Sequence, residues 1–208
     1  MRFIDPDGMN VDDYSLDKQG NMKLEAVKKE DPKDHLYVKK DDGTLDKNKS
    51  IEVDKGTLDN LSKTSGDGIS KATTTNVDDA VKVFMFAANH SDAEWAIVSH
   101  TPGKGIDLYT VATKHNSYKS PSPLALGFSN SETNSSIHSH PGISPTYYWE
   151  DQSMGYFDPK RLTAIGDVLR SYDRMAENGG KEPFPNYVYF PNTRHFWKAG
   201  PREKTLIK

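Results

Sequence analysis

The sequence predicts an α+β (or α/β) domain over residues 76–203, preceded by a segment rich in β-hairpins over residues 16–75. Two patterns predict the domain: one segment with apolar residues at helical spacing, and several short apolar runs separated by turns. The third observation concerns the N-terminal part, where Asp, Lys, Gly and Asn dominate and apolar alternations are brief. Residues 1–15 form a separate tail in this division.

The hairpin-rich segment contains two clear alternations, Met22–Val27 and His35–Val38. Turn-forming residues separate them, including Gly20-Asn21 and Asp42-Gly43, as expected for short β-hairpins. The strands carry few apolar side chains, so we expect a loosely packed β-meander. The charge and low hydrophobicity leave a disordered spacer as the alternative. Residues 62–75 are polar and predict a linker.

The domain begins with a helix. Asn76 is a favourable N-cap, and Asp78 and Asp79 follow in the first turn, where the helix dipole favours acidic side chains. Apolar residues then recur at helical spacing up to Ala88.

Strands and a second helix follow the first helix. The apolar runs are short and bounded by turn residues, which gives a mixed β-sheet flanked by helices. We expect strands at 94–99, 108–112, 135–140, 187–190 and 195–198, and a helix at 168–176.

Composition excludes several classes of function. The formal net charge is −3 and the pI is about 6.2, so there is no basic surface of the kind that nucleic acid requires. No apolar run is long enough to insert into a membrane. The N-terminus lacks the apolar core of a secretion signal, which leaves a piece of a larger exported protein as one interpretation. The chain has no cysteine, so any metal must be bound by histidine and carboxylate.

The most informative motif is Ser136–Gly142, which contains His138 and His140. In an extended strand, alternate side chains point to the same face, so these two imidazoles project together. Paired imidazoles form half of a divalent metal site, and catalytic Zn²⁺ usually has three protein ligands and one water. The remaining protein ligand would then be an oxygen.

Two acidic residues are candidates for that ligand. Asp167 follows Gly166 at the start of the expected second helix, where backbone N–H groups would fix its carboxylate. A plain helix N-cap without metal is the alternative for Asp167, and Asp151 is the rival ligand. A general base is also needed, and Glu94 opens an apolar strand beside Trp95. The alternative for Glu94 is a solvent-facing residue at a strand start.

The order of these motifs resembles the JAB/MPN (JAMM) metalloprotease family, in which a Glu precedes His-x-His-Pro and then Ser-x-x-Asp. It is more similar to the JAB-like toxin domains at the C-termini of bacterial Rhs/YD-repeat polymorphic toxins. The supporting segments are Asn89–Trp95, Ser136–Pro141, Gly166-Asp167 and Asn186–Phe190, and Phe3–Met9 resembles the end of an Rhs core. The resemblance implies a cytidine-deaminase-like layout.

The resemblance also implies roles for individual residues. His138 and His140 would bind Zn²⁺, and Glu94 would be the general base. Strict family spacing places the third ligand at Asp151. An insertion in the loop places it at Asp167, which we favour because it has a helix start behind it. With the same insertion, Ser153 would stabilise the oxyanion.

The implied activity is that of a zinc-dependent metallopeptidase or isopeptidase that acts as the toxic effector of a bacterial polymorphic toxin. Its substrate would be a protein, ubiquitin-like or isopeptide-linked, and a cognate immunity protein would bind it. It would be delivered into a target cell as part of a larger exported protein. One alternative is a catalytically degenerate binding module of the same fold. The other is a metal-dependent nuclease, which the acidic balance of the chain disfavours.

Overall fold

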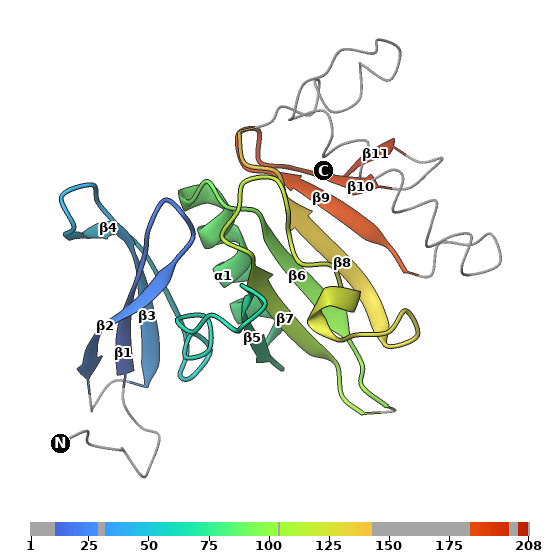
Figure 1. The fold of residues 1–208 in the computed structure, drawn as a ribbon, viewed down its shortest axis with the longest axis horizontal. Coiled ribbons are helices and arrows are strands. Elements are labelled where there is room, and N and C mark those ends of the chain that lie inside the picture. The colour runs from blue at the N-terminus through green and yellow to red at the C-terminus, as the bar shows by residue number, and fades with distance from the viewer. Residues whose placement is uncertain (1–10, 29–31, 104, 143–183, 200–203, 208) are drawn as a thin grey trace.

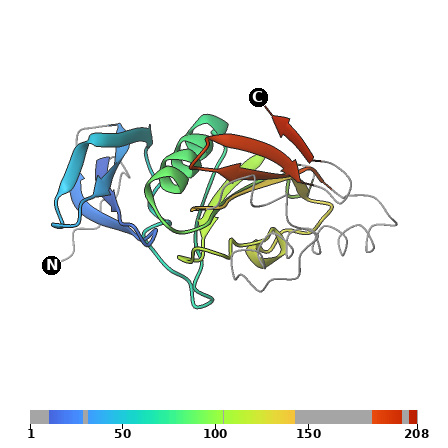
Figure 2. The same ribbon diagram turned by 90° about the horizontal axis from the view of Figure 1, so that it is seen from above.

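The computed structural model describes residues 11–28, 32–103, 105–142, 184–199 and 204–207. Within these ranges the chain forms a four-stranded sheet, a seven-stranded sheet and one α-helix, α1. The helix lies between the two sheets (Figures 1 and 2). This arrangement confirms the predicted α+β class with a mixed sheet.

The N-terminal segment forms a four-stranded sheet that contains β-hairpins, but the expected loosely packed β-meander is wrong, because β1 and β3 pair in parallel and one face is buried. Its strand order is β2-β1-β3-β4, with antiparallel outer pairs and parallel pairing between β1 and β3. One face is apolar: the side chains of Tyr14, Leu16, Leu36 and Val53 are at most 1% exposed. The strands are β1 (Val11–Leu16), β2 (Met22–Lys28), β3 (Lys33–Lys39) and β4 (Leu45–Asp54).

The seven-stranded sheet contains all five strands predicted for the domain. Its order is β11-β10-β9-β8-β6-β7-β5, and only β8 and β9 pair in parallel. The strands are β5 (Ser70–Thr74), β6 (Trp95–His100), β7 (Leu108–Thr113), β8 (Thr133–Ser139), β9 (Asn186–Phe190), β10 (His195–Ala199) and β11 (Lys204–Ile207). The predicted helix at 168–176 lies outside the described residues.

The predicted linker at 62–75 is wrong for its last part. Residues 70–74 form β5, which pairs with β7 at the edge of the sheet. Composition hides this strand because its exposed positions are polar, while alternate side chains such as Ala72 are buried.

Helix α1 (Val77–His90) begins as the sequence predicts, with the Asn76 side chain accepting hydrogen bonds from the backbone N–H groups of Asp78 and Asp79. Seven of its fourteen residues are buried, because the two sheets cover it from both sides. One continuous apolar cluster joins Leu16 and Leu36 of the first sheet, Phe84 of α1, and Trp95 of the second sheet. The two sheets therefore share a single hydrophobic core.

Polar contacts fix the first sheet to both ends of α1. At the start of the helix, Asp79 Oδ2 accepts a hydrogen bond from the Asp54 N–H at 2.7 Å, and Asn76 Nδ2 donates to Asp54 Oδ2 at 2.9 Å. Just after its end, the Asp92 N–H donates to the Lys18 carbonyl at 2.7 Å. These bonds orient the first sheet on the helix.

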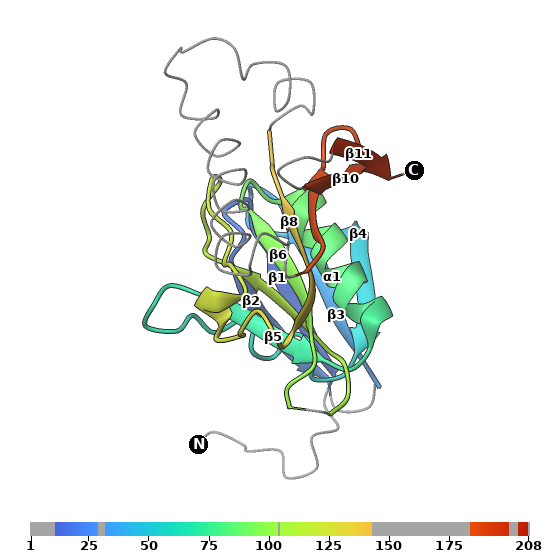
Figure 3. The ribbon, with the colours of Figure 1, turned by 90° about the vertical axis from the view of Figure 1, so that its right-hand side faces the viewer.

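The opposite face of the seven-stranded sheet, which we call the far face, points away from α1. A short 3₁₀ helix, η1 (Leu124–Leu126), covers part of it (Figure 3). There Leu126 packs with Ile69, Val98 and Ala112 in a second, smaller apolar cluster. No helix within the described ranges is long and apolar enough to cross a membrane.

Candidate metal centre

The histidine pair lies on the far face, at one end of the central strands. In β8, Ile137 packs against the α1 core, so the alternation of a strand directs His138 to the far face. His138 pairs with Ala96 of β6. Glu94 lies two residues before Ala96, directly before the start of β6, and therefore points to the same face. Strand pairing therefore brings Glu94 close to the two histidines, although His138 lies 44 residues after Glu94 in the sequence.

The two imidazoles converge through the same ring atom. Nε2 of His138 and Nε2 of His140 are 3.0 Å apart, and the side chains are buried, with exposed fractions of 7% and 1%. Two nitrogen ligands at the usual Zn–N distance in a tetrahedral site would be about 3.3 Å apart. The pair therefore fits two ligands of one Zn²⁺ ion.

Glu94 contacts the other ring nitrogen of His140. Its Oε1 lies 3.1 Å from His140 Nδ1, and its side chain is only 3% exposed. Carboxylates commonly contact the non-ligating nitrogen of a metal-binding histidine, where they fix the orientation of the ring. In this structure Glu94 thus occupies the position of a residue that orients His140, and it is close enough to the pair to exchange protons there.

The backbone of Glu94 is fixed on both sides. Its N–H donates to the Asn116 carbonyl at 2.7 Å, and its carbonyl accepts from Thr113 Oγ1 at 2.9 Å. Because both peptide groups are bonded, the carboxylate is carried by a rigid segment. Such rigidity is what a catalytic or metal-orienting carboxylate requires.

Two further residues support the pair, and the sequence does not predict their roles. The Phe190 ring stacks on the His140 ring, with centroids 5.9 Å apart and planes inclined by 21°. Ser139 Oγ accepts a hydrogen bond from the Trp95 N–H at 2.9 Å, which links the end of β8 to the start of β6. In the sequence, Phe190 and Ser139 stand out only because they belong to the motif segments. Their contacts could not be predicted, because the pairing of β8 with β9 joins segments that are distant in sequence.

The predicted third ligand, Asp167, lies outside the described residues, as do its rival Asp151 and the predicted oxyanion donor Ser153. Within the part of the chain that the structure describes, no three His, Cys, Asp or Glu side chains form a group that could hold a metal ion. The described site therefore consists of the histidine pair and Glu94.

The other histidines lie apart from this site. His100 is buried at the other end of β6, where its ring stacks on Phe128 with centroids 3.7 Å apart and Nε2 contacts Thr110 Oγ1 at 3.0 Å. Burial lowers the pKa of His100 and of His90, the residue at the end of α1. Packing explains the position of both rings, since His90 contacts the Phe86 ring with centroids 4.8 Å apart.

Comparison with known proteins finds a family model similar to the region that contains this site. The model of the family described as JAB-like toxin 1 matches residues 72–170. The match covers α1, Glu94 and both histidines, and it extends over Asp151, Ser153 and Asp167. No curated protein and no solved structure matches the chain. Residues 72–170 are thus similar to JAB-like toxin 1, and this similarity supports a JAB-like toxin domain.

Proposed function

We propose that the chain is a zinc-dependent peptidase or isopeptidase that acts as the toxic effector of a bacterial polymorphic toxin. The observation that carries the proposal is the convergence of two buried imidazole Nε2 atoms beside a buried carboxylate. Similarity of this region to JAB-like toxins supports the toxic role.

His138 and His140 would hold Zn²⁺, with Asp167 as the third ligand and Asp151 as its rival. When bound, Zn²⁺ would lower the pKa of a water molecule and polarise the scissile carbonyl. Glu94 would accept a proton from the attacking water and return it to the leaving amine; this role requires its carboxylate to leave Nδ1 of His140, where it lies in this structure. Ser153 would donate a hydrogen bond to the developing oxyanion.

The substrate would be a protein, either ubiquitin-like or joined through an isopeptide bond, and a cognate immunity protein would hold the domain inactive. A toxin domain fits delivery into a target cell, and we propose that an Rhs/YD-repeat protein carries it there.

Metal analysis and cleavage test the proposal together. The purified protein should contain one equivalent of zinc that a chelator removes, and His138→Ala or His140→Ala should abolish zinc binding. His195→Ala is the matched control, because His195 is an exposed histidine of β10. A folded protein that binds no zinc would contradict the proposal.

Cleavage is measured by mass spectrometry of new amine ends in a bacterial lysate incubated with the protein. Glu94→Gln should retain zinc but reduce the rate of cleavage about 10²–10⁴-fold, the usual contribution of a general base. Cleavage at the unchanged rate by Glu94→Gln would show that Glu94 is not the base.

A further inference from the structure

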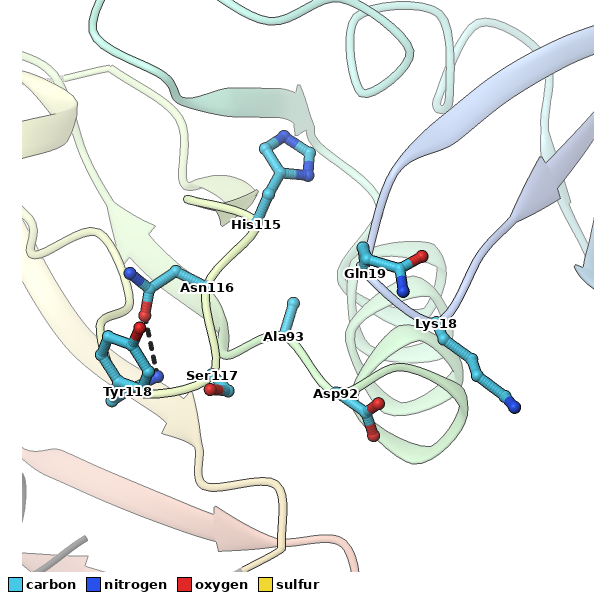
Figure 4. Close-up of a pocket in the computed structure, with 8 residues that line it drawn as sticks. All are labelled: Lys18, Gln19, Asp92, Ala93, His115, Asn116, Ser117 and Tyr118. Atoms are coloured by element: carbon cyan, nitrogen blue, oxygen red, sulfur yellow. Dashed lines mark hydrogen bonds between the residues drawn. The ribbon is translucent and has the colours of Figure 1, made fainter. Parts of the chain in front are cut away.

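A polar pocket lies where the four-stranded sheet meets the region similar to JAB-like toxins. Its volume is about 270 Å³. The turn between β1 and β2 forms one wall through Lys18 and Gln19, and the connection from α1 to β6 forms another through Asp92 and Ala93. Residues 115–118, which follow β7, complete it (Figure 4).

Direct hydrogen bonds hold the walls of this pocket together. The Lys18 carbonyl accepts from the Asp92 N–H at 2.7 Å. The His115 ring bridges the two sheets, because Nδ1 contacts the Gly20 carbonyl at 3.2 Å and Nε2 contacts Ser70 Oγ at 2.9 Å. The pocket is therefore formed before any ligand arrives, which lowers the entropic cost of binding.

The pocket adjoins the candidate metal centre. One of its lining residues, Asn116, accepts the hydrogen bond of the Glu94 N–H at 2.7 Å. Another, Ala93, is the immediate neighbour of Glu94 in the chain. The pocket therefore lies beside the backbone segment that carries Glu94.

The charges around the pocket favour a cationic ligand. The Lys18 ammonium lies 2.8 Å from Asp41 Oδ1 and also interacts with the Asp92 carboxylate, so two acidic side chains accompany one lysine at this pocket. Burial lowers the pKa of His115, which keeps that ring neutral at pH 7. Tyr118, which is 64% exposed, also lines the pocket, and the face of an aromatic ring attracts cations.

The size of the pocket limits the ligand to a single side chain. Pockets for drug-sized molecules measure about 300–1,000 Å³, more than the space available here. We propose that this pocket binds a lysine or arginine side chain of the polypeptide substrate, beside the bond to be cleaved. The role as a substrate subsite rests on the proposed function, whereas the binding of a basic side chain does not.

Binding can be measured without catalysis, in the Glu94→Gln protein. Nα-acetyl-lysine amide is titrated into the ¹⁵N-labelled protein and followed by NMR, with the uncharged Nα-acetyl-norleucine amide as the comparison ligand. We expect the lysine compound to shift the amide signals of Lys18, Asp92 and Tyr118, and the norleucine compound to bind at least several-fold more weakly. Equal binding of the two compounds, or shifts confined to other residues, would overturn the proposal.

Substitution of the carboxylate provides the second test. Asp92→Asn should weaken binding of the lysine compound by about two- to fivefold, the contribution of an exposed ion pair. Asp78→Asn is the matched control, since Asp78 is an exposed aspartate at the other end of α1, and it should leave binding unchanged. Unchanged binding in Asp92→Asn, with the fold intact by circular dichroism, would refute the assignment.

The cleavage sites found in the lysate experiment separate this proposal from the proposed function. Selective binding of the lysine compound without any hydrolysis would overturn the peptidase and leave the basic-side-chain pocket standing. Hydrolysis without enrichment of lysine or arginine near the cleaved bond would overturn the subsite alone.

Discussion

Substitution of Gly20 by alanine should weaken the junction between the two sheets. Gly20 has φ +82°, and a Cβ atom at this position would lie 2.6 Å from Ala93 Cβ. The left-handed conformation costs a non-glycine residue about 1–2 kcal/mol, and overpacking costs about a further 1–3 kcal/mol. Gly20→Ala should therefore lower the free energy of unfolding by about 2–5 kcal/mol.

Gly43 provides the matched control. It has nearly the same φ, +84°, in the turn between β3 and β4, but a Cβ atom there would meet nothing within 4 Å. Gly43→Ala should show only the conformational cost, about 1–2 kcal/mol. The difference between the two variants measures the contact between the turn and Ala93.

Urea unfolding followed by tryptophan fluorescence is a suitable assay, because Trp95 Nε1 lies 3.6 Å from the Cβ position at Gly20. A difference of about 1–3 kcal/mol between the variants corresponds to roughly 2–12 °C in Tm for a chain of this size. Equal losses of stability in Gly20→Ala and Gly43→Ala would refute the reasoning, since the turn would then not be packed against Ala93.

Three other substitutions test separate parts of the structure. Burial raises the pKa of Asp34 to about 6, so the folded state retains this proton above the pH at which the unfolded chain loses it. Stability should therefore fall by up to about 3 kcal/mol as the pH rises from 4 through 6, and Asp34→Asn should flatten this decline in urea titrations at pH 4.5 and 7. Ser139→Ala removes the acceptor of the Trp95 N–H and should lower the free energy of unfolding by about 1–3 kcal/mol. The Trp95 amide should then exchange faster with solvent in the native state, and an unchanged exchange rate would argue against this role of Ser139. Asn76→Ala removes both the cap of α1 and the bond to Asp54; it should lower Tm by several degrees, a loss of about 1–2 kcal/mol, and an unaltered Tm would contradict it.

The histidine pair illustrates what the sequence could predict. The period of a strand is enough to place His138 and His140 on one face, and the structure confirms the strand that carries His138, with His140 directly after its end. Proximity of Glu94 required one more fact, the pairing of β6 with β8, which spacing alone does not specify. The role of Glu94 beside Nδ1 of His140 was not predictable, because it depends on ring orientation.

The four-stranded sheet illustrates what the sequence could not predict in detail. The sequence does not predict β1, because Asp12 and Asp13 interrupt its apolar alternation. The parallel pairing of β1 with β3 and the packing of Gly20 on Ala93 both join distant segments. Such contacts depend on tertiary structure, which local propensity does not predict.

The position of α1 between two sheets limits where the polypeptide can be divided. The similarity to JAB-like toxins begins at residue 72, yet the side chains that cover one side of α1, such as Leu16 and Leu36, come from the first sheet. If a protease cut between residues 62 and 69 and the first sheet dissociated, Phe84 and its neighbours would be exposed to water. The remaining fragment would then be prone to aggregation. The smallest piece that keeps its solubility should accordingly begin before β1, which is where truncation for crystallisation or for expression as a fusion should be made.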